Sequence, residues 1–171
     1  MMLVAMMLAA ASPTMTDAQL ATQIHNINKM EIDVGKLGEK DCQSAQCKEL
    51  ARMIRTDHEQ ADKKVTGIVK PDESSLPQEI TEQNKTDHAN VDQLKKMKGA
   101  EFDKTFGQMM VQGHQDAIQM LKDNQSNIQN QQLKSFVAET LPKLQQHEDM
   151  ARKVMNGQPA AQGRAPENTP R

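Results

Sequence analysis

Apolar positions recur at steps of three and four over most of the chain, the spacing of a helix with one side turned to a core. Residues that favour helix starts and stops bound these stretches. The pattern predicts four long helices: from about Thr16 to Lys40, from after Ser44 to before Pro71, from about Ala100 to Asn124, and from about Asn130 to Asn156. The pattern therefore predicts an all-α protein.

Each of the four apolar stripes is interrupted by one ionisable residue. These residues are Glu31, His58, His114 and His147, one in each predicted helix. A titratable side chain on the apolar side of a helix points to the core. The sequence therefore predicts a polar layer inside a helical bundle.

Residues 70–99 form a polar connection with a helix of its own. Pro77 suits a first helical turn, and the large apolar residues that follow are Ile80, Val91 and Leu94. Nearly 20 helical residues rise about 27 Å, enough to run from one end of a bundle to the other. Two hairpins joined by such a crossover predict a ferritin-like, up-down-down-up four-helix bundle.

The heights of the four ionisable residues support this path. Counted from the turn that holds Cys42 and Cys47, they fall within about five residues of one another, roughly 7.5 Å of rise. In an up-down-up-down bundle the spread grows to about eight residues. We therefore expect the carboxyl group and the three imidazoles to converge.

The first 15 residues read as a signal-like leader. Eleven apolar residues end in Ala9-x-Ala11, a plausible cleavage site, and this run is too short to span a bilayer. The alternative is a disordered apolar leader. We expect export to the periplasm or the outer membrane, a bundle domain over 16–157 and a disordered tail over 158–171. No other hydrophobic run approaches membrane length, so we expect no transmembrane span in the mature chain.

The net charge of -2, the absence of Trp and Tyr, and only three Phe argue against nucleic-acid binding, which needs basic surfaces and stacking rings. Cys42 and Cys47 lie in the connection between the first two helices. In an exported protein two such cysteines are expected to form a disulfide. It would contribute about 2 kcal/mol in the chain-entropy model.

The sequence resembles a bacterial family, the domain of unknown function four-one-four-two, which is ferritin-like and often labelled an outer-membrane protein. The resemblance covers about residues 18–155. It implies a fold and an exported location but no activity. The family usually has Asp before the histidine of the third helix, where this chain has Gly113. The stretches that carry the resemblance are 30–37, 53–58, 102–106, 114–117 and 140–147.

The third helix is also similar to part of a group of small exported helical proteins associated with copper. The shared features are a Met-x-x-x-His spacing and a His-x-x-x-x-x-Met spacing. In this chain they are formed by Met110, His114 and Met120.

One interpretation of the polar layer is a metal site. Three imidazoles with Glu31 suit zinc or copper, and the thioethers of Met110 or Met150 would favour Cu(I). A di-iron site needs about four carboxylates and two Glu-x-x-His motifs. Arg55 and Leu144 stand where those motifs need Glu, so we do not expect di-iron chemistry.

The alternative interpretation is a buried polar network that fixes the register of the helices. The protein would then be a structural or stress-related envelope protein that acts through protein partners. An enzyme is the interpretation that the sequence favours least, because no Ser-His-Asp or Cys-His arrangement and no phosphate-binding loop is recognisable.

Overall fold

The computed structural model describes residues 13–157. Within this range the protein contains helices and no strand, as predicted. The predicted tail, and the leader up to residue 12, lie outside the described residues. The elements are α1 (Asp17–Asp41), α2 (Ala45–Ile68), η1 (Glu73–Ser75), α3 (Gln78–Leu94), α4 (Gly99–Asn124), η2 (Gln125–Asn127) and α5 (Gln131–Met155).

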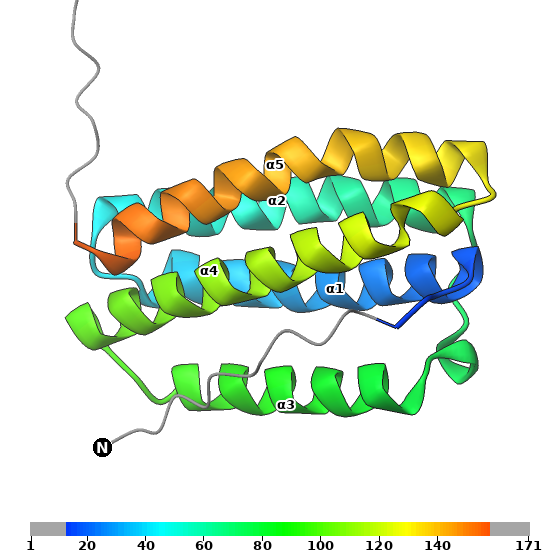
Figure 1. The fold of residues 1–171 in the computed structure, drawn as a ribbon. Helices are drawn as coiled ribbons and strands as arrows, with labels where there is room; N and C mark the ends of the chain where they lie inside the picture. Colours follow the sequence, from blue (N-terminus) through cyan, green and yellow to red (C-terminus); the bar gives the residue numbers. More distant parts are fainter. Residues whose placement is uncertain (1–12, 158–171) are drawn as a thin grey trace, which may run out of the picture.

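The four long helices follow the predicted up-down-down-up path. In Figure 1, α1 and α2 form one antiparallel hairpin and α4 and α5 form the other. Helix α3 carries the chain back along the bundle, so that α2 and α4 run in the same direction. The crossover over 70–99 is therefore helical, as the sequence predicts.

Local signals in the sequence fix where the helices begin. The Thr16 hydroxyl accepts a hydrogen bond from the Gln19 backbone, and the Gln19 side chain bonds the Thr16 N–H in return. The Ser44 hydroxyl and the Asn130 amide oxygen cap α2 and α5 by accepting hydrogen bonds from backbone N–H groups of the first helical turn. These caps place α1, α2 and α5 within about one residue of their expected starts.

The turn between α1 and α2 is held at two points. Cys42 and Cys47 form the expected disulfide. The carboxylate of Asp103, near the start of α4, accepts one hydrogen bond from the Gln43 N–H and one from the Ser44 N–H, each 2.7 Å long. This end of the bundle is therefore tied together covalently and by hydrogen bonds.

The core has two apolar clusters, and the polar layer lies between them in sequence on every long helix. One cluster includes Leu20, Val65 and Leu133. The other includes Val34, Phe102 and Val154 and contains the disulfide. Met15, which is part of the expected leader over 1–15, is buried in the first cluster.

The two hairpins also depend on close helix contacts. A Cβ atom added to Gly107 of α4 would lie 2.7 Å from the Met155 nitrogen of α5. The glycine therefore allows the two backbones to approach, which is the role expected for a glycine inside a helix.

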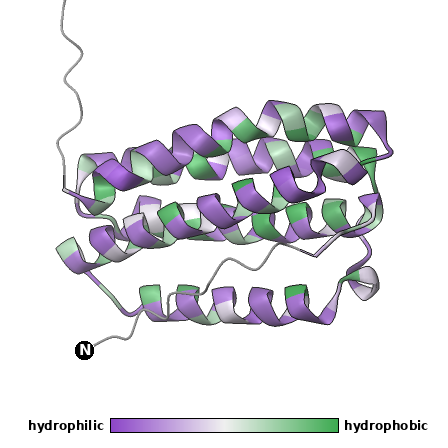
Figure 2. Ribbon diagram, viewed as in Figure 1, coloured by the Kyte–Doolittle hydropathy of each residue, from purple (hydrophilic) through white to green (hydrophobic). Residues whose placement is uncertain are grey.

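Helix α3 covers the bundle with little apolar burial. Its buried residues are Val91 and Leu94, both near its C-terminal end, and most of the helix is hydrophilic (Figure 2). In the first half of the helix, the side-chain amide of Asn84 exchanges two hydrogen bonds, of 2.9 and 3.0 Å, with that of Gln23 in α1. Among the helices of residues 13–157, none combines the length and the apolarity needed to cross a membrane.

Candidate metal centre

Three histidines from three different helices meet in the core. His58 of α2, His114 of α4 and His147 of α5 each offer a ring nitrogen, and the three nitrogens lie within 4.8 Å of one another. The side chains are almost completely buried. We call these three residues the histidine group. The sequence prediction that imidazoles converge at one height is met by this geometry.

The Nδ1 of His58, which we call its outer nitrogen, is hydrogen-bonded to a neighbouring helix. Its Nδ1 lies 2.8 Å from the Asn28 Oδ1 of α1. Because an amide oxygen accepts, Nδ1 carries the proton and Nε2 presents a lone pair. That Nε2 is buried and has no hydrogen-bond partner. An unpartnered buried nitrogen is costly unless a ligand occupies the space beside it.

His114 is oriented by its own helix. Its Nδ1 donates to the Met110 backbone carbonyl over 2.8 Å. A carbonyl oxygen can only accept, so Nε2 of the neutral ring has a free lone pair. This lone pair points to His147.

His147 completes the arrangement. Its Nε2 lies 2.9 Å from the Asp57 carboxylate, and its Nδ1 lies 3.1 Å from the His114 Nε2. The carboxylate accepts, so a neutral His147 carries its proton on Nε2 and its Nδ1 is a lone pair. Two lone pairs then face each other. Only a cation, either a shared proton or a metal ion, makes this contact favourable.

Burial disfavours the shared proton. Desolvation, reinforced by the neighbouring imidazole of His147, lowers the pKa of His114 to about 3. Desolvation also lowers the pKa of His58 well below its usual value, and it lowers the pKa of His147 even though Asp57 acts in the opposite direction. All three rings are therefore neutral near pH 7, which is the state that binds metals.

Glu31 lies in the polar layer but outside the histidine group. Its side chain is buried, its Oε2 has no partner, and its Oε1 lies 3.6 Å from where a Cβ of Gly113 would be. Burial, and then the charge of Asp87, raises the pKa of Glu31 to about 8. The acid is therefore protonated at pH 7, and the structure gathers three of the four expected ligands.

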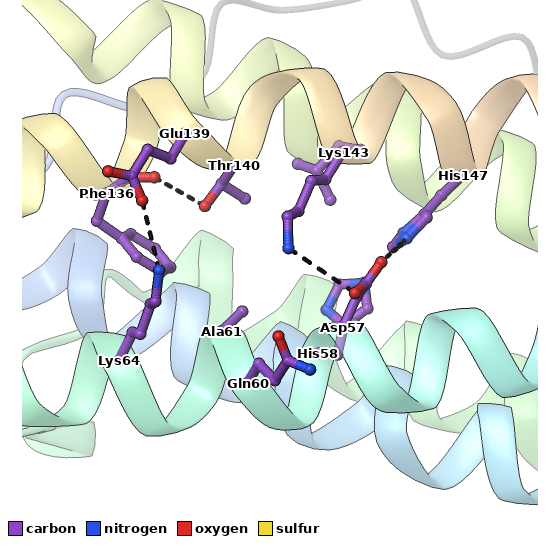
Figure 3. A pocket seen from close by; sticks show the side chains of 11 residues that line it. Asp57, His58, Gln60, Ala61, Lys64, Phe136, Glu139, Thr140, Lys143 and His147 are labelled. Carbon is purple, nitrogen blue, oxygen red and sulfur yellow. Dashed lines mark hydrogen bonds and ion pairs between the residues drawn. The ribbon is translucent and has the colours of Figure 1, made fainter.

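A pocket between α2 and α5 reaches the histidine group from the surface (Figure 3). It encloses about 50 Å³ and is lined by His58 and His147, with Asp57 and Lys143 beside them. This volume is enough for a few water molecules. The pocket is a path by which a small ion or ligand can enter.

Residues 4–154 match the model of a family described as Domain of unknown function (DUF4142). The chain belongs to the DUF4142 family. No protein with a curated description matches the sequence. Among solved structures, the chain is similar to "CopM in the Cu(II)-bound form", with a TM-score of 0.66 and 14% identity. The match covers 85% of this chain and 99% of that chain. At this identity the similarity shows a shared helical fold.

The methionines considered as soft ligands in this DUF4142 chain pack in apolar surroundings. Met110 is buried in the cluster that holds the disulfide, and Met150 packs against the same cluster. Met120 lies in the other cluster. The structure records a contact of His114 with the backbone oxygen of Met110.

Two residues of the site were not found by sequence reasoning. Asn28 and Asp57 hold the outer nitrogens of His58 and His147. Asp57 directly precedes His58 in one of the stretches that carry the resemblance, and sits about 100° around the helix from it. That offset turns Asp57 to α5 and away from its neighbour. The position of Asp57, a polar residue next to a core histidine in the sequence, was the signal that could have identified it.

Proposed function

We propose that this protein binds a transition-metal ion, copper or zinc, on His58, His114 and His147. The observation that carries the proposal is the 3.1 Å contact between the His114 Nε2 and the His147 Nδ1. The other nitrogen of each ring is already held by an acceptor. A metal ion between the rings removes the repulsion of the two lone pairs and takes the lone pair of His58 as well.

The surroundings of the three rings support a metal ligand set. Histidine ligands usually donate their second N–H to a carboxylate or a carbonyl, which fixes the ring and raises its basicity. Here the acceptors are the Asp57 carboxylate, the Met110 carbonyl and the Asn28 amide oxygen. Imidazole ligands suit zinc and copper, and the Cu(II)-bound state of CopM favours testing copper first.

The role we propose is metal binding or buffering in the cell envelope, in the periplasm or at the outer membrane. The signal-like leader of residues 1–15 supports export. So does the Cys42–Cys47 disulfide, because such bonds persist in oxidising compartments.

The test is the melting temperature of untagged protein with and without one equivalent of Cu(II) or Zn(II). Binding to the folded state alone raises the melting temperature. His58→Ala should abolish that rise. His88→Ala is the matched control, since His88 is an exposed histidine on α3, and it should leave the rise intact. An equal rise in both variants would exclude the histidine group as the site.

The polar-network function remains the second candidate because Asp57 can stabilise a protonated His147. In that case the layer holds a proton in place of a metal, and the protein acts through protein partners. Metal would then leave the melting curve unchanged. Glu31→Gln and His58→Ala would each shift stability by the same amount with and without metal.

A further inference from the structure

The histidine group supplies three ligand atoms, one from each ring. Within residues 13–157, the ligand-type side chains that gather there are His58, His114 and His147. A four-coordinate ion on three imidazoles keeps one position for another ligand, the arrangement that distinguishes open metal sites from closed structural ones. The question is which side of the ion that position faces.

The pocket between α2 and α5 lies on one side of the group. Two of the three histidines, His58 and His147, line it, whereas His114 is not part of its wall. Its other walls include the apolar side chains of Ala61, Phe136 and Leu144. A ligand that enters here would meet the ion between the rings of His58 and His147.

The charges in the pocket are placed unevenly. The Lys143 Nζ lies 3.8 Å from the Asp57 Oδ1, and the Asp57 Oδ2 is held by His147. In Figure 3 the Lys143 ammonium points to the end of the pocket that holds the histidines. At the other end, Lys64 is paired with Glu139 over 3.4 Å. The Lys143 ammonium opposes the charge of Asp57, and the neutral His147 donates a hydrogen bond to the same carboxylate, so an incoming anion meets a carboxylate whose charge is compensated.

We propose that the fourth coordination position opens into this pocket and takes a small monoanion from solution, with Lys143 as its charge partner. The inference rests on the proposed metal site and adds to it a class of ligand. The pocket, with about 50 Å³, has room for anions of a few atoms. The protein would therefore hold its ion in a form that a small ligand can reach.

The probe is azide, added to protein loaded with one equivalent of Cu(II). Azide bound to Cu(II) gives a charge-transfer absorption band, and electron paramagnetic resonance reports whether the copper stays bound. We expect a saturable band. Lys143→Met, which keeps the length of the side chain and removes its charge, should weaken azide affinity about fivefold, the order of one partly exposed ion pair. Lys64→Met is the matched control and should leave azide affinity unchanged.

A second variant tests the pocket itself. Ala61→Leu adds volume to its wall and should suppress the azide band while the copper signal persists. The inference fails if bound copper shows no azide band, or if the band appears only in Glu31→Gln, because the carboxyl group would then occupy the fourth position. Those results leave the metal site standing. Absence of copper binding would overturn the proposed function and this inference together.

Discussion

Within residues 13–157, two groups of three potential metal ligands lie in the core, and their ligand atoms are used differently. One is the histidine group. The other comprises Cys42, Cys47 and Asp103, which we call the cysteine group. In both, the three side chains are buried and their ligand atoms lie within 4.8 Å of one another. By residue type and distance alone, both would count as candidate metal sites.

The difference lies in which atoms are already used. The two sulfurs of the cysteine group are bonded to each other. Both carboxylate oxygens of Asp103 accept backbone N–H groups of the α1–α2 turn. In the histidine group, the outer nitrogens are used and the inner lone pairs are left facing one another. Among the described residues, the buried side-chain atoms without a partner are Asn28 Nδ2, Glu31 Oε2 and His58 Nε2. Glu31 and His58 belong to the polar layer, and Asn28 is hydrogen-bonded to His58. A site is marked by unused lone pairs that converge.

Removing the disulfide is the most direct test of the difference between the two groups. Cys42→Ser combined with Cys47→Ser should lower the free energy of unfolding by about 2 kcal/mol, because the unfolded chain regains the freedom of a small loop. Urea unfolding of metal-free protein measures this. Copper and zinc affinity should not change, since the cysteine group contributes no free ligand. A loss of metal affinity in the double variant would show that the two groups are not independent.

The two groups should also differ in how they make stability depend on pH, because the polar layer titrates and a disulfide does not. Folded Glu31 holds its proton up to pH about 8, whereas its ordinary pKa is 4.5. Unfolding therefore releases a proton between these values, and stability falls as pH rises through them, by about 1.4 kcal/mol per pH unit. The histidines act in the opposite sense. Their lowered pKa values mean that unfolding takes up protons below pH 6.5.

Metal-free protein should therefore be most stable near pH 6.5, the ordinary pKa of histidine. Below this pH, the protons that the histidines take up on unfolding outnumber the one that Glu31 releases, so stability falls with acid. Above it, the proton released by Glu31 alone determines the slope of stability with pH. Glu31→Gln should remove the fall in stability between pH 6.5 and 8 and keep the fall on the acid side. Urea unfolding across this range checks both limbs. Parallel curves for the two proteins above pH 6.5 would contradict a protonated Glu31.

The smallest expected effect concerns Asp57. Asp57→Asn keeps an oxygen that can accept from the His147 Nε2 and removes the charge that makes the ring more basic. Metal affinity should fall about tenfold, the lower end of the range for residues that orient a metal ligand. Asp62→Asn is a matched control, since Asp62 bonds His25 outside the polar layer. Competition with a chromophoric chelator measures both variants.

Most of the fold could be predicted from the sequence because its determinants are local. The spacing of apolar residues and the capping residues decide where the helices begin and end, and the length of the crossover decides in which direction they run. Counting residues along each helix gives the height of a side chain, and this was enough to place His58, His114 and His147 together. It was not enough for Glu31, because height leaves open how far each helix is rotated about its axis. Asp57 was missed for the same reason. It does not lie on the apolar stripe of α2, yet its carboxylate reaches His147 on the neighbouring helix α5.

Helix α3 has a consequence for how the molecule opens. Val91 and Leu94 are the buried residues of this helix, and polar contacts such as the Gln23–Asn84 amide pair hold it farther from its C-terminal end. Segments with so few apolar contacts unfold locally at low free energy. The amide protons in the first half of α3 should therefore exchange with solvent while α1, α2, α4 and α5 stay protected. Because the charge of Asp87 on this helix raises the pKa of the buried Glu31, such openings would also change the electrostatic surroundings of this acid.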